Sequence, residues 1–123
     1  MEEQIRTMLR DALPGTPIDW GSRPQGSGYP GVVLQIASDT SGHTYDGPDG
    51  LSVSRVQVDV YALSYGEARV LARQVRSALD GYRSGSVMGT FRVGERDSRE
   101  GGSGEAERPF RVSQDFEIHW RFA

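Results

Sequence analysis

Residues 51–82 constrain the fold most, because they predict a long strand that leads directly into a well-defined helix. Ser64 and Glu67 form the S-x-x-E pattern of a capping box, in which the serine side chain satisfies a free backbone N–H at the helix start. Gly81 favours the end of the helix, because glycine adopts the left-handed conformation at little cost. The apolar residues of the strand recur at every second position, at Val56, Val58, Val60 and Ala62. Those of the helix recur at helical spacing, at Ala68, Leu71, Ala72, Val75, Leu79 and Tyr82.

The segments before this stretch predict a helix and two shorter strands. Residues 2–13 have a helical apolar stripe and are followed by Pro14-Gly15, which favours the end of a helix. Residues 18–20 and 32–37 are short strand candidates, separated by a loop rich in Gly, Pro and Ser. Leu51 and Val53 are out of phase with Val56, so we expect a β-bulge near Ser54 and Arg55. The stripe of the first helix consists of Ile5, Met8, Leu9, Ala12 and Leu13.

Two more strands are predicted after the central helix. The first covers residues 86–96, with Val87, Phe91 and Val93 on one face. The second covers residues 110–122, where only Gln114 interrupts an inward set that is rich in aromatic residues. That inward set consists of Phe110, Val112, Phe116, Ile118, Trp120 and Phe122. The central residues of the core are expected to be Val58, Val60, Leu71, Val75, Phe116, Ile118 and Trp120.

The predicted element order is α-β-β-β-α-β-β, in one domain that covers residues 1–123. Neighbouring strand candidates imply hairpins, and hence an α+β fold with a mostly antiparallel sheet and two helices on one face. Residues 39–50 and 97–108 lack apolar periodicity and are expected to be long loops. Loops of this length are often functional.

Composition excludes several classes of protein. There is no cysteine, so disulfides and thiolate metal sites are absent. No apolar run is long enough for a signal peptide or a membrane span, which predicts a soluble cytoplasmic chain with no membrane partner. The net charge of −3 argues against a dedicated nucleic-acid-binding protein. All 14 basic residues are arginines, which fits either a high-GC genome or the enrichment of arginine at interfaces.

The sequence offers little catalytic chemistry. His119 falls on the polar side of the last strand, where an exposed side chain is the simpler interpretation. A cluster of three aspartates and one histidine within residues 39–49 could ligate a divalent cation, although its spacing does not match the EF-hand loop. No phosphate-binding motif is present. We therefore expect no catalytic residue, no cofactor and no metal, with a small metal-dependent enzyme as the alternative. The cluster of that alternative is Asp39, His43, Asp46 and Asp49.

Several charged residues and one tyrosine are candidates for an interface. Arg69, Arg73 and Arg76 lie on one side of the central helix, either as a solvated face or as a surface for the carboxylates of a neighbour. Tyr45 lies in an otherwise polar segment and is a candidate anchor. The acidic candidates in the two predicted loops are Asp46, Asp49, Glu100 and Glu105.

The chain resembles the tail-completion, or tail-terminator, proteins of long-tailed bacteriophages and related gene-transfer particles. The resemblance rests on an R-x-Q-x-D-x-Y-A strand at residues 55–62 and an A-x-x-L-A-x-x-V-R-x-A-L helix at residues 68–79. The acidic ERDSRE segment, the closing strand RVSQDFEIHWRF, the N-terminal amphipathic helix and the length also match.

This resemblance implies a structural virion protein of the tail or neck that is assembled in the host cytoplasm. Such a subunit forms a ring, commonly a hexamer, which caps the tail tube and joins it to the head connector. Its implied partners are other copies of itself, the tail tube protein and the head–tail connector protein, while DNA passes without specific binding. The family has no catalytic residues to transfer to this chain. Another neck or tube component, such as a stopper or adaptor, is the alternative within the same class.

Overall fold

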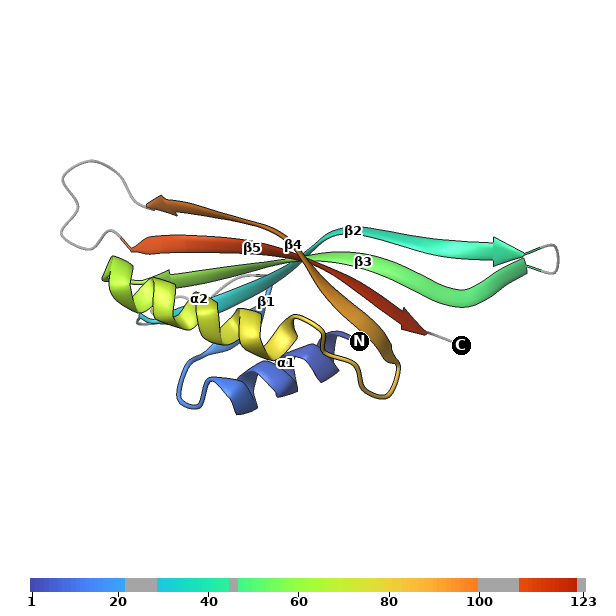
Figure 1. Ribbon diagram of the computed structural model, residues 1–123, viewed down its shortest axis with the longest axis horizontal. Coiled ribbons are helices and arrows are strands. Elements are labelled where there is room, and N and C mark those ends of the chain that lie inside the picture. Colours follow the sequence, from blue (N-terminus) through green and yellow to red (C-terminus); the bar gives the residue numbers. More distant parts are fainter. Residues whose placement is uncertain (22–28, 45–46, 100–108, 122–123) are drawn as a thin grey trace.

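The computed structural model describes residues 1–21, 29–44, 47–99 and 109–121, with residues 40–44, 47–51 and 98–99 described by their backbone. Two helices lie on one face of a five-stranded sheet (Figure 1). The elements are α1 Glu2–Ala12, β1 Ile18–Trp20, β2 Gly31–Thr44, β3 Gly47–Ala62, α2 Tyr65–Leu79, β4 Val87–Arg99 and β5 Phe110–Arg121.

The sheet has the strand order β1-β2-β3-β5-β4. The short β1 is parallel to β2, and every other neighbouring pair is antiparallel. The predicted α+β fold and its element order are therefore confirmed. Central positions belong to β3 and β5, whose alternating apolar residues face the helices and form the core.

The core contains the predicted residues, with Trp120 at its margin. Phe116 and Ile118 of β5 are fully buried, whereas Trp120 is partly buried and packs against the core. Gln114 was expected to interrupt the inward set, but it is fully buried and its Nε2 donates to the Ala72 carbonyl oxygen at 2.7 Å. A satisfied amide fits an apolar layer because the hydrogen bond offsets its desolvation. Phe122 lies outside the described residues.

The stripe of α1 is only partly as predicted. Ile5, Leu9 and Leu13 are buried, and Met8 packs against the core. Ala12 is exposed, because it lies where α1 faces an open groove beside α2.

Both predicted ends of α2 are confirmed. The Glu67 backbone N–H donates to the Ser64 hydroxyl at 3.1 Å, so Ser64 caps the helix. At the other end Gly81 has a φ of +84°, the left-handed conformation that glycine adopts without strain.

Replacing Ser64 by alanine is expected to lower the free energy of unfolding by about 1 kcal/mol, because the Glu67 N–H loses its acceptor. Ser77→Ala is the matched control, since Ser77 is exposed in the last turn of the same helix and is not its N-cap. Urea denaturation of both variants measures the difference. Equal stability of the two variants would contradict a contribution from the cap.

The predicted bulge lies in the neighbouring strand rather than in β3. The register between β3 and β5 is unbroken from Leu51 to Ala62, whereas the register between β2 and β3 shifts at Ala37. Because β3 keeps its period of two, Ser52 and Ser54 rather than Leu51 and Val53 are on the helix-facing side. Ser54 tolerates burial because its hydroxyl is hydrogen-bonded.

The segment 39–50, predicted as a loop, is for the most part a β-hairpin. β2 continues to Thr44 and β3 begins at Gly47, with Ser41 opposite Ser52 and His43 opposite Pro48. The loop prediction was wrong because backbone pairing defines a strand whether or not its side chains alternate in polarity. We call residues 38–44 and 47–55 the hairpin arm, and Figure 1 shows it extending beyond the two helices.

Strand β4 also differs from its prediction. It ends at Arg99, so residues 97–99 belong to the sheet and not to a loop. Val87 is buried, but Phe91 and Val93 are 53% and 45% exposed, so the three do not share one buried face. The reason is a pair of register shifts, one between Val87 and Gly89 and one between Arg92 and Gly94. Each extra residue reverses which face the following side chains occupy.

Candidate functional site

A polar network joins the start of α2 to β4. Arg69 Nη1 lies 2.9 Å from Glu95 Oε2 and 3.1 Å from Asp97 Oδ1, and the Tyr65 hydroxyl donates to Asp97 Oδ2 at 2.9 Å. The hydrogen bond to Glu95 raises the pKa of Arg69, and the hydrogen bond to Asp97 raises the pKa of Tyr65. Arg92 adds a longer contact to Glu95, at 3.6 Å. The network therefore fixes α2 against its own sheet.

This network changes the interpretation of the arginine face. Arg69 was an interface candidate, yet its guanidinium is paired within the same chain. Asp97 was missed because residues 97–108 were treated as a loop, and Glu95, in the strand predicted at residues 86–96, was not paired with the helix. The period of two that relates Glu95 to Asp97 was the available signal, because it places two carboxylates on one face of a strand.

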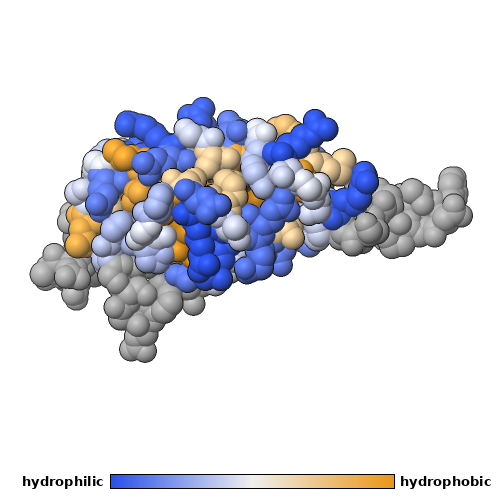
Figure 2. All heavy atoms as spheres, turned by 90° about the horizontal axis from the view of Figure 1, so that it is seen from below, coloured by the Kyte–Doolittle hydropathy of each residue, from blue (hydrophilic) through white to orange (hydrophobic). Residues whose placement is uncertain are grey.

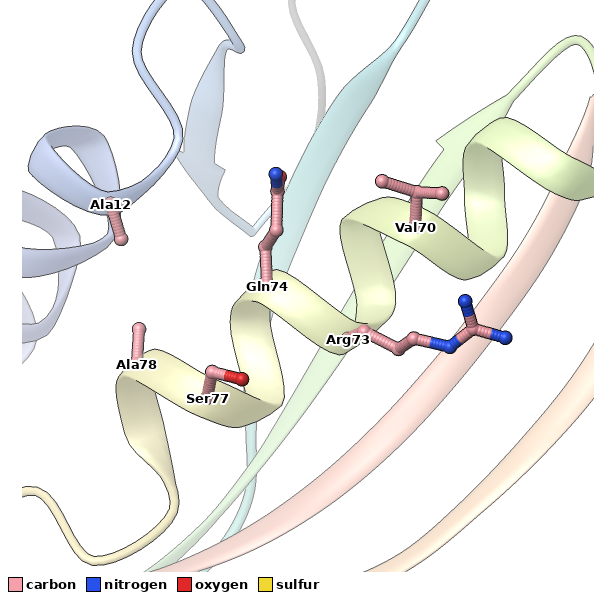
Figure 3. A pocket seen from close by; sticks show the side chains of 6 residues that line it. All are labelled: Ala12, Val70, Arg73, Gln74, Ser77 and Ala78. Atoms are coloured by element: carbon pink, nitrogen blue, oxygen red, sulfur yellow. The ribbon is translucent and has the colours of Figure 1, made fainter.

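Arg73 and Arg76 remain available for a partner. Both side chains are exposed, and neither forms an ion pair within the described part of the chain. Arg73 lines a surface groove of about 490 Å³ between α1 and α2. Figure 3 shows Ala12 of α1 opposite Ala78 of α2, with Gln74 and Val70 further along α2.

The helix layer as a whole is predominantly polar. Figure 2 views the molecule from the helix side and shows hydrophilic side chains over much of the surface, with small hydrophobic areas between them. Val70, at 50% exposure, is an isolated apolar side chain in the groove. Among the described residues, this face therefore has no large apolar docking patch.

The exposed apolar side chains of the sheet lie near its outer strands. Strand β4 exposes Met88, Phe91 and Val93, and β2 exposes Ile36 at 43%. The Phe91 ring packs edge-to-face against His119, with centroids 5.4 Å apart. His119 is thus a partly exposed strand residue, as expected.

The base of the hairpin arm carries a second hydrogen-bonded group. Asp39 Oδ1 accepts from the hydroxyls of Ser52 and Ser54 at 2.8 and 2.6 Å, and Trp120 Nε1 donates to Ser54 Oγ at 2.8 Å. The bulge at Ala37 places Asp39 opposite Ser54. These bonds connect β2, β3 and β5 where the arm leaves the body.

The other predicted site residues are only partly described. Tyr45, Asp46, Glu100 and Glu105 lie outside the described residues. Asp49 lies in β3 and His43 in β2, each described by its backbone.

For the metal-binding alternative, Asp39 is engaged by two serines. Among the described residues there is no group of three or more His, Asp or Glu side chains placed to hold a metal ion. No described helix is long and apolar enough to cross a membrane.

Comparison with known proteins identifies the family. The model of the family "Tail completion protein gp17" matches residues 3–120, so the chain belongs to this family and is a structural tail protein. No curated protein matches the chain. A chain from the solved structure "Virion of native gene transfer agent (GTA) particle" has a similar fold, with a TM-score of 0.66 and 16% identity over 92% of this chain and 84% of that one.

Proposed function

We propose that the protein is a non-enzymatic subunit of a homo-oligomeric ring, commonly a hexamer in the family it resembles, that caps the tail tube and joins it to the head connector. The family match over residues 3–120 carries the proposal. The fold supports it with a sheet whose outer strands expose apolar side chains and with an arm that extends beyond the body.

The distribution of charge favours a head-to-tail contact between subunits. Arg73 and Arg76 lie exposed on α2, while the acidic residues Glu100, Glu105 and Glu107 follow β4 in the sequence. Opposite charges on separate surfaces suit a contact in which one patch meets a different patch of the next copy, and such contacts close into rings. The acidic net charge of −3 also fits a channel through which DNA passes without being bound. On this proposal the ring assembles in the host cytoplasm and remains in the virion.

The test is binding of the purified protein to isolated tail tubes. We expect rings at one end of the tubes in electron micrographs, and light scattering should show little association at low concentration without tubes. A protein that stays monomeric and ignores tubes at high concentration would overturn the proposal. Binding to an isolated head connector but not to tubes would instead favour a stopper or adaptor.

Reversing the charge of Arg73 and Arg76 tests the contribution of α2. The Arg73→Glu/Arg76→Glu variant is expected to cap fewer tubes than the unmodified protein, because it places carboxylates against an acidic neighbour. Arg83→Glu is the control, since Arg83 is also exposed but lies in the turn after α2. Unchanged capping by the double variant would remove α2 from the subunit contact.

A further inference from the structure

At each lateral edge of the sheet, one stretch of strand has no backbone hydrogen-bond partner among the described residues. On one side, β1 covers β2 only from Val32 to Leu34. On the other, β4 pairs with β5 through one edge, and its second edge is only partly occupied. Open strand edges are templates for pairing with another strand.

The occupied part of the β4 edge shows which backbone N–H and C=O groups of β4 point away from its partner strand β5. The Gly81 N–H donates to the Thr90 carbonyl oxygen at 2.8 Å, and the Arg92 N–H donates to Asp80 Oδ1 at 3.1 Å. Outward-facing backbone groups alternate along an antiparallel strand. After the shift at Val93, the next outward residues are therefore Glu95 and Asp97, and no outward backbone partner is recorded for them in the described residues.

The same reasoning applies to β2. The Gly21 N–H donates to the Leu34 carbonyl oxygen at 2.8 Å, which shows that the backbone groups of Leu34 point away from β3. Further along β2, the backbone groups of Ile36 also point away from β3. After the bulge at Ala37, those of Asp39 and Ser41 do so. A surface groove of about 640 Å³ lies beside Ile36, so there is space for an incoming strand.

Strand direction makes the two open edges compatible. Strands β2, β3, β5 and β4 alternate in direction across the sheet. A second copy in the same orientation therefore presents its β2 antiparallel to β4 of the first. The open part of β4 lies at the end of the sheet where Asp97 is opposite Val112, whereas the hairpin arm extends from the other end (Figure 1). To bring the two open edges together, the second copy must therefore be shifted along the strand direction relative to the first.

Two further observations favour a contact between β2 and β4 of different copies. A two-stranded hairpin is only marginally stable in water, and a third strand supports it. Pairing two β4 strands about a two-fold axis would be an isologous contact that stops at a dimer, whereas the proposed ring needs a contact between two different edges. Val93 and Ile36, at 45% and 43% exposure, lie at opposite ends of this antiparallel contact, and each adds apolar area at its own end.

We infer that the open edge of β4, residues 93–99, pairs with the open edge of β2, residues 36–41, of a second copy, so that the sheet continues from one subunit to the next. This inference rests on the proposed ring and names its subunit contact. It also assigns a role to the hairpin arm, which lies alongside β4 of the neighbouring copy.

Cysteine cross-linking tests the contact cleanly, because the natural chain has no cysteine. Arg96→Cys and Ser38→Cys are made singly and together, and treated with a short bifunctional maleimide during assembly on tubes. Both side chains are exposed, and in the antiparallel contact Ser38 lies within about two residues of the position opposite Arg96. The double variant is expected to form a ladder of dimers and higher multimers. A mixture of the two single variants should stop at dimers, and each single variant alone should stay uncross-linked. The control pair is Val70→Cys/Ser38→Cys, because Val70 is also exposed but lies on α2.

The outcomes separate this contact from the proposed function. Dimers from Arg96→Cys alone, or an equal ladder from the control pair, would overturn the β2–β4 contact. Rings on tubes without a ladder would overturn the contact and leave the proposed function standing, whereas failure of the unmodified protein to assemble would overturn both. Hydrogen exchange on the unmodified chain is an independent measurement: on assembly the amides of Glu95, Asp97, Asp39 and Ser41 should exchange on the order of tenfold more slowly.

Discussion

Replacing Phe116 by alanine is expected to lower the free energy of unfolding by about 3–5 kcal/mol, the range for truncating a buried phenylalanine. Phe116 is fully buried, and its neighbours in the sheet register are Val56 of β3 and Arg92 of β4. The loss combines the transfer free energy of the ring with a cavity between two packed layers, which cannot collapse freely.

Phe91→Ala is the matched control for this prediction. Phe91 is 53% exposed and loses mainly its edge-to-face contact with His119, so its loss should stay below about 1.5 kcal/mol. Equilibrium denaturation with unchanged m-values gives both numbers. Similar losses for the two variants would mean that the inward and outward faces of the sheet are assigned incorrectly.

Replacing Asp59 by alanine is expected to lower the free energy of unfolding by about 1–3 kcal/mol, because its buried partner would be left unsatisfied. Asp59 is 2% exposed on the face of the sheet opposite the helices. It accepts hydrogen bonds from the Ser113 hydroxyl and from Gln57 Nε2. Ser113 is 1% exposed, so water cannot easily replace the lost acceptor.

Asp115→Ala is the control on the same face. Asp115 pairs with Arg96, whose side chain is 53% exposed, and such pairs contribute about 0–1 kcal/mol. In a double-mutant cycle, Asp59→Ala combined with Ser113→Ala should cost less than the sum of the single changes, by about 0.5–3 kcal/mol. Additive losses would show that the two side chains do not depend on one another.

Local patterns in the sequence were sufficient for the helices and for the central strand. Ser64 and Gly81 mark the ends of α2 because capping depends on residues within one helical turn. The alternating valines of β3 and the aromatic residues of β5 define the core-facing side, since a period of two fixes which side chains share a face.

The interface candidates were harder to place from sequence. Helical spacing put Arg69, Arg73 and Arg76 on one side of α2, but spacing says nothing about what lies opposite that side. The structure brings Glu95 and Asp97 to Arg69 and leaves Arg73 in an open groove. The contacts of Tyr45, Asp46, Asp49, Glu100 and Glu105 remain predictions.

The sequence by itself determined the α+β class, the order of the elements, the caps of α2 and the apolar faces of β5, of α2 and of residues 56–62, because each depends on neighbours along the chain. Only the tertiary structure decided where strands are paired and where register shifts. It converted the polar segment 39–50 into a hairpin arm, moved the bulge to Ala37 and turned Phe91 and Val93 outward. The physical reason is that a strand is defined by hydrogen bonds to a partner distant in sequence, and one unpaired residue reverses the faces of all that follow.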